Sequence, residues 1–394
     1  MRAKVRAMVS LAVVMTAAML VSGCGHYVCH TTFGASTCTP PAGGIGGGGK
    51  TGSPVAFAFF ADDNNGKIGA ALLDSLGNFN LISNFTSPTF TPAIDGGMVV
   101  IQKKWLYMPL TSLQIVGYSI NATTGALTAL PGSPYTTSDS FSMTSDPAGK
   151  FLFVGGGTLN TISVFQINQT DGSLIETAGS PFSTTGVITP WQAATDGLGK
   201  FLYVAPGPFS HSVAAYAIDG STGALSLVAG SPFPYNMSEV KGELTGKFLF
   251  GVTGQSGVNG TPIDDHIYVF NIDQTSGAIS PLTGSPFVTL YAPINITVHP
   301  NGKLLYTFNE SAAGQTSPME GFQINTSTGA LTPVSNLTGI AMPEGMFDQS
   351  GAYLFTHPVA SLTAFSANGT SGALANVANV GIGSNFGWAV VDVH

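Results

Sequence analysis

A turn motif that recurs seven times constrains this chain more than any other feature of its sequence. Each copy places a glycine in a short polar segment between two apolar runs, as in STGALS at 221–226. The seven glycines lie 43 to 54 residues apart: Gly77, Gly125, Gly172, Gly223, Gly277, Gly329 and Gly372. Glycine adopts the positive φ that a three-residue hairpin loop requires without steric cost. A unit of about 50 residues built around such a hairpin is typical of a β-propeller blade.

Each unit has the pattern of four short strands, and helical periodicity is absent throughout. A Gly-Lys turn precedes the second strand, as in Gly199-Lys200 before FLYV, and an apolar third strand such as 213–218 precedes the glycine turn. The shorter fourth strand ends, in four copies, in Gly-Ser-Pro-Phe or Gly-Ser-Pro-Tyr. Because proline cannot donate to a strand ladder, this motif suits the end of an outer edge strand.

The two ends of the array complement each other. Residues 55–60, 69–74 and 79–83 match the second, third and fourth strands of a blade that lacks its first strand, whereas 387–392 match a first strand with no blade after it. Joining them gives seven complete blades without an open sheet edge. We therefore predict an all-β fold over residues 55–394. It is a seven-bladed β-propeller with four-stranded antiparallel blades, closed by the C-terminal strand pairing into the N-terminal blade.

The repeat also resembles a known family. Its succession of DPAGK (146–150), FLYV (201–204), TGALT (328–332) and GSPF (284–287) is similar to the seven-bladed lactonase-type propellers, YVTN-type repeat proteins that include 6-phosphogluconolactonase-like proteins. The resemblance covers about residues 55 to 394 and implies a lactonase, a carboxylic ester hydrolase. Every matching motif is a turn or a core strand, so the motifs specify the fold more strongly than the chemistry.

The N-terminus predicts export. A basic start and an apolar run over residues 7–21 form a signal peptide of residues 1–23, too short to span a membrane as a helix. The stretch LVSGC at 20–24 resembles a bacterial lipobox, which predicts lipidation of Cys24. The alternative is an ordinary signal peptide and an unmodified cysteine. We expect a cell-envelope lipoprotein, on the periplasmic or extracellular face, that meets the membrane only through its lipid anchor.

Residues 24–54 form the predicted tether between the lipid and the propeller. Its second half is rich in proline and glycine and is typical of a flexible linker. Cys29 and Cys38 are the only cysteines besides Cys24. In an oxidising compartment they would close a small disulfide loop, and two free thiols are the alternative.

The charge pattern excludes some partners. The chain has a formal net charge of −8, and its two arginines, Arg2 and Arg6, both lie in the signal peptide. Nucleic acid and anionic lipid surfaces require clustered cations, so neither is an expected partner. A phosphorylated lactone would also be expected to meet a guanidinium clamp, which the mature chain cannot provide. We expect a monomer that binds a small lactone or a carbohydrate.

One face of the propeller is the candidate for function. The loops that join the second to the third strand differ from blade to blade, whereas the glycine turns on the other face repeat almost unchanged. Variable loops on a rigid scaffold are where binding sites are usually built. Alignment of the first strands places six side chains at one position near the mouth of the channel on this face: Ser142, Gln192, Glu239, Asn295, Glu344 and Trp388. Lys241 follows two residues after Glu239, on the same side of the strand.

This ring offers carboxylates, amides and an amine around one cavity. Glu239 or Glu344 could activate water as a base or hold a metal, while Lys241, Gln192 or Asn295 could face a tetrahedral oxyanion. The oxygen ligands of this ring could hold calcium in the central channel, and the sequence contains no spacing that assigns metal ligands. The alternative is a channel whose polar residues only organise water.

Two histidines are further candidates. His211 and His266 occur in equivalent loops of consecutive blades, and Asp264 and Asp265 precede the second. One of them could bind substrate or act as a general base, and surface-loop residues without a function are the alternative.

Two functions remain open at this point. The resemblance implies hydrolysis of a small lactone, with a non-phosphorylated one favoured by the missing arginines. The second function is a non-catalytic cell-envelope propeller that binds a glycan, a peptide or a partner protein on the same face. The low charge content, 8%, fits both functions.

Overall fold

A computed structural model of the chain describes residues 28–32, 35–39, 52–62, 66–82, 97–156, 160–184, 190, 192–206, 212–254, 264–310, 316–334, 337, 340, 342, 344–357, 361–382 and 388–392. The chain divides into two compact units, Met1–Lys50 and Thr51–His394. The predicted signal peptide and Cys24 lie outside the described residues. A search of the described part finds no helix with the length and apolarity to cross a membrane.

The first unit contains a small hairpin. Strand β1 (Val28–Thr32) pairs antiparallel with β2 (Ala35–Thr39), and Cys29 lies directly opposite Cys38 in the ladder. The hairpin lies in the first half of the predicted tether segment, around the two cysteines. The cross-strand position brings the two cysteine backbones together, and the disulfide itself stays a prediction.

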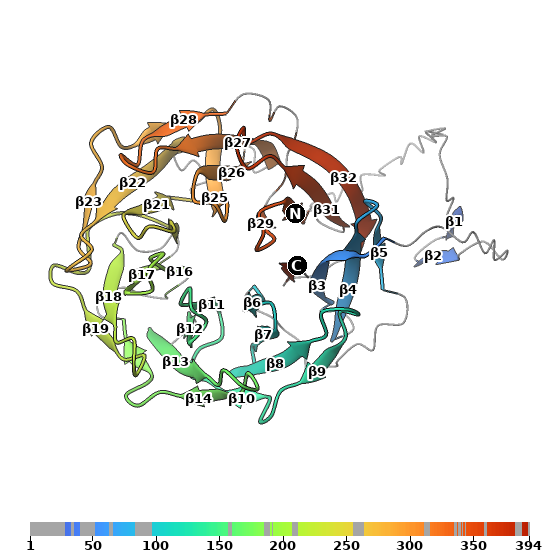
Figure 1. Cartoon of the computed structure of the whole chain (residues 1–394), viewed down its shortest axis with the longest axis horizontal. Helices are drawn as coiled ribbons and strands as arrows, with labels where there is room; N and C mark the ends of the chain where they lie inside the picture. Colours follow the sequence, from blue (N-terminus) through green and yellow to red (C-terminus); the bar gives the residue numbers. More distant parts are fainter. Residues whose placement is uncertain are drawn as a thin grey trace, which may run out of the picture. The chain divides into compact units, whose positions relative to one another are not determined.

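The second unit is a ring of seven antiparallel sheets (Figure 1). In order along the ring the strands are β33 (Trp388–Asp392), β3 (Pro54–Asp62), β4 (Lys67–Asp74) and β5 (Phe79–Leu81); β6 (Val99–Ile101), β7 (Trp105–Leu110), β8 (Gln114–Ile120), β9 (Leu127–Ala129) and β10 (Tyr135–Thr136); β11 (Ser142–Ser145), β12 (Phe151–Gly155), β13 (Thr161–Ile167), β14 (Leu174–Glu176) and β15 (Phe182–Ser183); β16 (Gln192–Thr195), β17 (Phe201–Ala205), β18 (Ala214–Ile218) and β19 (Leu225–Leu227); β20 (Glu239–Gly242), β21 (Phe248–Val252), β22 (His266–Ile272), β23 (Ile279–Pro281) and β24 (Phe287–Val288); β25 (Ala292–Val298), β26 (Leu304–Glu310), β27 (Thr316–Ile324) and β28 (Leu331–Pro333); β29 (Gly345–Phe347), β30 (Tyr353–Thr356), β31 (Ser361–Ala367) and β32 (Leu374–Gly381). The predicted seven-bladed all-β fold is confirmed.

The first strand of every blade lies at the centre. Figure 1 shows β6, β11, β16, β25 and β29 around the middle of the ring and β14, β19, β23 and β28 at its periphery. Each inner strand contacts the next one, in the order β6, β11, β16, β20, β25, β29, β33 and back to β6. The inner strands therefore form a closed circle, which is the frame for the candidate site.

The C-terminal strand closes the ring as predicted. β33 pairs with β3, with Trp388 opposite Phe60 and Asp392 opposite Ala56. Val390 and Val391 of β33 are almost fully buried and belong to two different apolar clusters, one on each side of the blade. The last strand thus contributes backbone pairing and apolar packing at once.

The core lies between adjacent blades, and the turn glycines make this packing possible. All seven have positive φ, from 70° to 82°. At Gly223 an added Cβ would lie 2.7 Å from the ring of Phe151 in the preceding blade, so the turn has no room for a side chain. The buried hydroxyl of Tyr203 donates a hydrogen bond to the carbonyl oxygen of Gly277 in the next blade, at 3.0 Å. Each turn is therefore both a loop and a blade-to-blade contact.

The Gly-Ser-Pro motif does not end the outer strand. In three blades a second short segment, β10, β15 or β24, pairs with the third strand after the proline. Where the proline interrupts the ladder, the serine side chain accepts the hydrogen bond of a backbone N–H on the third strand. Ser285 Oγ accepts it from Val269 N at 2.9 Å, and Ser133, Ser180 and Ser231 do the same in their blades. The motif thus allows an interruption without an unsatisfied buried N–H.

Candidate functional site

The ladder registers place most of the predicted ring at one level. Ser142, Gln192, Glu239 and Asn295 each lie opposite the fifth residue of the neighbouring second strand: Gly155, Ala205, Val252 and Phe308. Their strands β11, β16, β20 and β25 contact one another in that order. The repeat alignment therefore holds for these four side chains.

Glu344 belongs to the same level. It directly precedes Gly345, which pairs with Thr356, so the residue beside Glu344 on the next strand is His357. Glu344 Oε1 lies 3.9 Å from His357 Nδ1, and the Glu344 side chain is 42% exposed whereas that of His357 is 11% exposed. Glu344 thus presents its carboxylate to solvent, and the more buried imidazole of His357 lies next to it.

Trp388 is displaced by one register step. Phe57 packs beneath the turn glycine of the next blade as Phe151 does in its own blade, so Phe57 is the counterpart of Phe151, although β3 begins earlier, at Pro54. Trp388 pairs with Phe60, three residues after Phe57, and is thus equivalent to Val240, which pairs with Gly251, three residues after Phe248. The alignment of Trp388 with Glu239 is wrong by one residue, because the terminal strand lacks the turn motif that anchors the other repeats.

Glu239 and Lys241 form an ion pair at this level. Lys241 Nζ lies 2.9 Å from Glu239 Oε1, with the Glu239 side chain 4% exposed and that of Lys241 35% exposed. The second oxygen, Glu239 Oε2, accepts a hydrogen bond at 3.1 Å from the backbone N–H of Ile296 in the adjacent blade. Both oxygens of the buried carboxylate are engaged, so Glu239 can position the ammonium group of Lys241 and is poorly placed to accept a proton from water.

The remaining ring members differ in character. Ser142 is buried, and its Oγ lies 3.5 Å from the carbonyl oxygens of Gly155 and Pro190, an arrangement that suits a structural hydroxyl more than a nucleophile. Gln192 and Asn295 are half-buried and present amide groups at the same level. His211 lies outside the described residues.

His357 is the residue that the repeat pattern did not single out. It follows YLFT in the second strand of the last blade, where the equivalent positions of other blades carry Gly155, Ala205, Val252 and Phe308. A polar residue at a position that is otherwise small or apolar is the signal that would have identified it.

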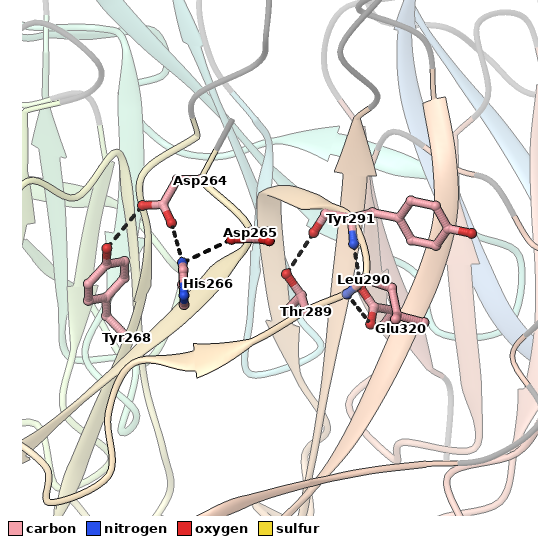
Figure 2. A network of polar contacts seen from close by, with 8 residues as sticks. All are labelled: Asp264, Asp265, His266, Tyr268, Thr289, Leu290, Tyr291 and Glu320. Atoms are coloured by element: carbon pink, nitrogen blue, oxygen red, sulfur yellow. Dashed lines mark hydrogen bonds and ion pairs between the residues drawn. The ribbon is translucent and has the colours of Figure 1, made fainter. Parts of the chain in front are cut away.

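A second polar network lies at the start of β22, the third strand of its blade, and beside the end of β24 (Figure 2). It runs from Tyr268 through Asp264 and His266 to Asp265, and the carbonyl oxygen of Asp265 accepts a hydrogen bond at 2.7 Å from Thr289 N. Among the described residues, Asp264, Asp265 and His266 are the group of side chains whose donor atoms lie close enough to share one metal ion.

Glu320 continues this network into the next blade. Its carboxylate accepts hydrogen bonds from the backbone N–H groups of Leu290, at 2.9 Å, and Tyr291, at 3.3 Å. Burial raises the pKa of Glu320, while these bonds and one from Asn309 act in the opposite direction. Glu320 therefore holds the segment 289–291 in place.

Seven sheets in a closed ring, with ionisable side chains at the inner strand ends of one face, define a β-propeller with a polar channel mouth. The chain belongs to the lactonase family of seven-bladed β-propellers: its sequence matches the family described as "Lactonase, 7-bladed beta-propeller" over residues 111–238 and 257–383. The resemblance noted from the repeat motifs is thereby confirmed.

Solved structures agree on the fold. A candidate 6-phosphogluconolactonase of Bacteroides fragilis is 16% identical with a TM-score of 0.64, and the alignment covers 86% of this chain and 98% of that one. The periplasmic gluconolactonase of Pseudomonas aeruginosa is 14% identical with a TM-score of 0.63, covering 86% of this chain and 99% of that one. At such identities the likeness shows the fold alone. A search of curated proteins found no match.

Proposed function

We propose that the chain hydrolyses a small, non-phosphorylated lactone at the inner ends of β20, β25 and β29. The observation that carries this proposal is the pairing of an accessible carboxylate, Glu344 beside His357, with an ammonium group, Lys241 held by Glu239, on inner strands separated only by β25. Family membership supports the reaction class.

Glu344 acts as the general base. It takes a proton from a water molecule whose oxygen attacks the lactone carbonyl carbon, and a tetrahedral oxyanion forms. The ring C–O bond then breaks, and the leaving alkoxide takes the proton back from Glu344, so the product is a hydroxy acid. His357 Nδ1 lies 3.9 Å from the carboxylate, so the imidazole restricts how the Glu344 side chain can turn.

Lys241 stabilises the oxyanion. The Lys241 side chain is about one-third exposed, and the buried Glu239 directs its ammonium group, so the group needs little reorganisation when negative charge develops. The amide groups of Gln192 and Asn295 lie at the same level and supply further donors. The mature chain has no arginine to clamp a phosphate, which supports a neutral, sugar-like substrate.

The test is a panel of lactones with acid release followed at constant pH, with and without calcium. Glu344→Gln is expected to lower kcat by about 100-fold or more, the usual contribution of a general base, and Lys241→Met by a similar factor. The matched control is Glu176→Gln, an exposed carboxylate on the outer strand β14. Unchanged turnover in both site variants would remove this site, and no turnover of any lactone by the parent chain would remove the reaction.

Export and lipidation complete the proposal. The lipobox-like LVSGC supports an anchor at Cys24 that keeps the propeller in the cell envelope. Metabolic labelling with a radioactive fatty acid is expected to mark the parent chain and not Cys24→Ser. Equal labelling of both proteins would contradict the anchor.

A second candidate function is supported by exposed apolar side chains beside the second polar network. Val288 is 67% and Leu290 82% exposed, and Tyr291 lies next to them. Such a patch fits binding of a glycan, a peptide or a partner protein without catalysis. Saturable binding of one of these ligands, lost in Leu290→Ser, together with no lactone turnover, would favour this function over hydrolysis.

A further inference from the structure

Asp264, Asp265 and His266 converge at the start of β22, away from the channel mouth. His266 Nδ1 lies 2.9 Å from Asp264 Oδ1 and 3.1 Å from Asp265 Oδ1 (Figure 2). The three side chains are partly exposed, from 15% for Asp264 to 50% for Asp265. Two carboxylate oxygens and one imidazole nitrogen thus surround a point that solvent can reach.

The surrounding structure holds each of the three residues in place. His266 pairs with Val288 in the β22–β24 ladder, and the backbone of Asp265 is bound to Thr289. The hydroxyl of Tyr268 donates to Asp264 Oδ2 at 3.1 Å, which leaves Oδ1 turned toward His266. Outer partners of this kind orient metal ligands in proteins.

Glu320 is not part of the group. Figure 2 shows its carboxylate turned to the backbone of Leu290 and Tyr291, where hydrogen bonds engage both of its oxygens. It instead fixes the segment that includes Thr289, the partner of Asp265.

A cavity adjoins the group and carries an independent signal for a polar ligand. It has a volume of about 260 Å³ and is lined by Asp264, Tyr268, Tyr235, Asn236 and Thr253, among others. Thr253 is 5% exposed, and its Oγ1 has no hydrogen-bond partner among the described residues. Buried hydroxyls are normally hydrogen-bonded, so Thr253 indicates that a polar ligand enters this cavity.

We propose that Asp264, Asp265 and His266 bind one divalent transition-metal cation, with Zn²⁺ as the first candidate, and that water ligands of this cation occupy the cavity beside Thr253. Donor atoms 2.9 and 3.1 Å apart suit ligands about 2.1 Å from a common ion at angles near 90°, as in octahedral coordination completed by water. The imidazole nitrogen favours a transition metal over calcium, which prefers oxygen ligands only. Three protein ligands leave coordination positions open, as at a catalytic or exchangeable metal site.

The test is a calorimetric titration of the full chain with Zn²⁺ after treatment with a chelator. Cys29→Ser/Cys38→Ser serves as the parent, because free thiolates would bind Zn²⁺ on their own. We expect one saturable site for Zn²⁺. Asp264→Asn and His266→Gln are expected to weaken binding by about 100-fold, and Tyr268→Phe by about 10-fold.

Asp273→Asn is the matched control, because Asp273 is an aspartate of the same blade that caps the glycine turn and has no place in the group. X-ray absorption on the Zn²⁺-loaded parent is expected to show one nitrogen among oxygen ligands, a readout that does not depend on the variants folding. No saturable Zn²⁺ binding by the parent, or equal binding by Asp264→Asn, His266→Gln and the control, would overturn the proposal. Neither outcome depends on lactone hydrolysis.

Discussion

Asp139 is a buried carboxyl group in the segment between β10 and β11. It is 1% exposed, the hydroxyl of Thr161 donates to its Oδ2, and its Oδ1 has no hydrogen-bond partner among the described residues. Burial raises the pKa of Asp139 to about 6, and the Thr161 hydrogen bond only partly opposes this shift. The folded protein therefore holds this proton more tightly than the unfolded chain does.

The raised pKa predicts a pH dependence of stability. A carboxyl group with a raised folded-state pKa stabilises the fold fully below the unfolded pKa of about 4, and this contribution is lost as pH rises to about 6. A shift of about two units corresponds to about 3 kcal/mol. We expect the melting temperature of the parent to fall relative to Asp139→Asn as pH rises from 4 to 6.

The difference between the two proteins is the measurement, because other groups titrate as well. Burial lowers the pKa of His299, which destabilises the fold as pH falls and so acts in the opposite direction in both proteins. Asp74, with a pKa lowered to about 2 mainly by its Asn78 hydrogen bond, titrates below this window. Parallel melting curves against pH for the parent and Asp139→Asn would contradict the assignment.

At the scale of elements, four blades each depend on one serine where the outer strand is interrupted. Ser285 Oγ accepts the hydrogen bond of Val269 N, and Val269 is fully buried. Ser285→Ala leaves this N–H without an acceptor, which we expect to destabilise the protein by about 1–3 kcal/mol in denaturant titrations. Ser276→Ala, which removes a bond in an exposed turn of the same blade, is expected to cost only a few tenths of that amount. Equal midpoints for the two variants would show that the serine is dispensable.

At the scale of the whole molecule, the ring is held closed by its last strand. Removing residues 385–394 deletes β33, exposes the inner edge of β3 and removes the burial of Val390 and Val391. We expect the melting temperature to fall by roughly 10 °C or more and the protein to become prone to association through the open edge. The control removes residues 1–50, which belong to the other compact unit, and is expected to melt like the parent. Normal melting of the C-terminal truncation would contradict the closure.

The sequence by itself determined the architecture. The number of blades, their strand order and the closure by the chain's end all follow from the repeat. Its turns and apolar strands are local features, so each copy specifies a four-stranded blade independently of the others. The common position of Ser142, Gln192, Glu239 and Asn295 on their first strands could be predicted for the same reason, because each lies a nearly constant number of residues from its own turn motif.

Only the tertiary structure decided which groups meet between segments. The bond from the backbone N–H of Ile296 to Glu239 joins two adjacent blades, and the pattern within a single repeat does not predict it. Trp388 was misplaced because its strand has no neighbouring turn of its own, and its register is set by pairing with β3 at the far end of the chain. Local chemistry specifies the repeat, whereas the contacts that make a site depend on how separate blades pack together.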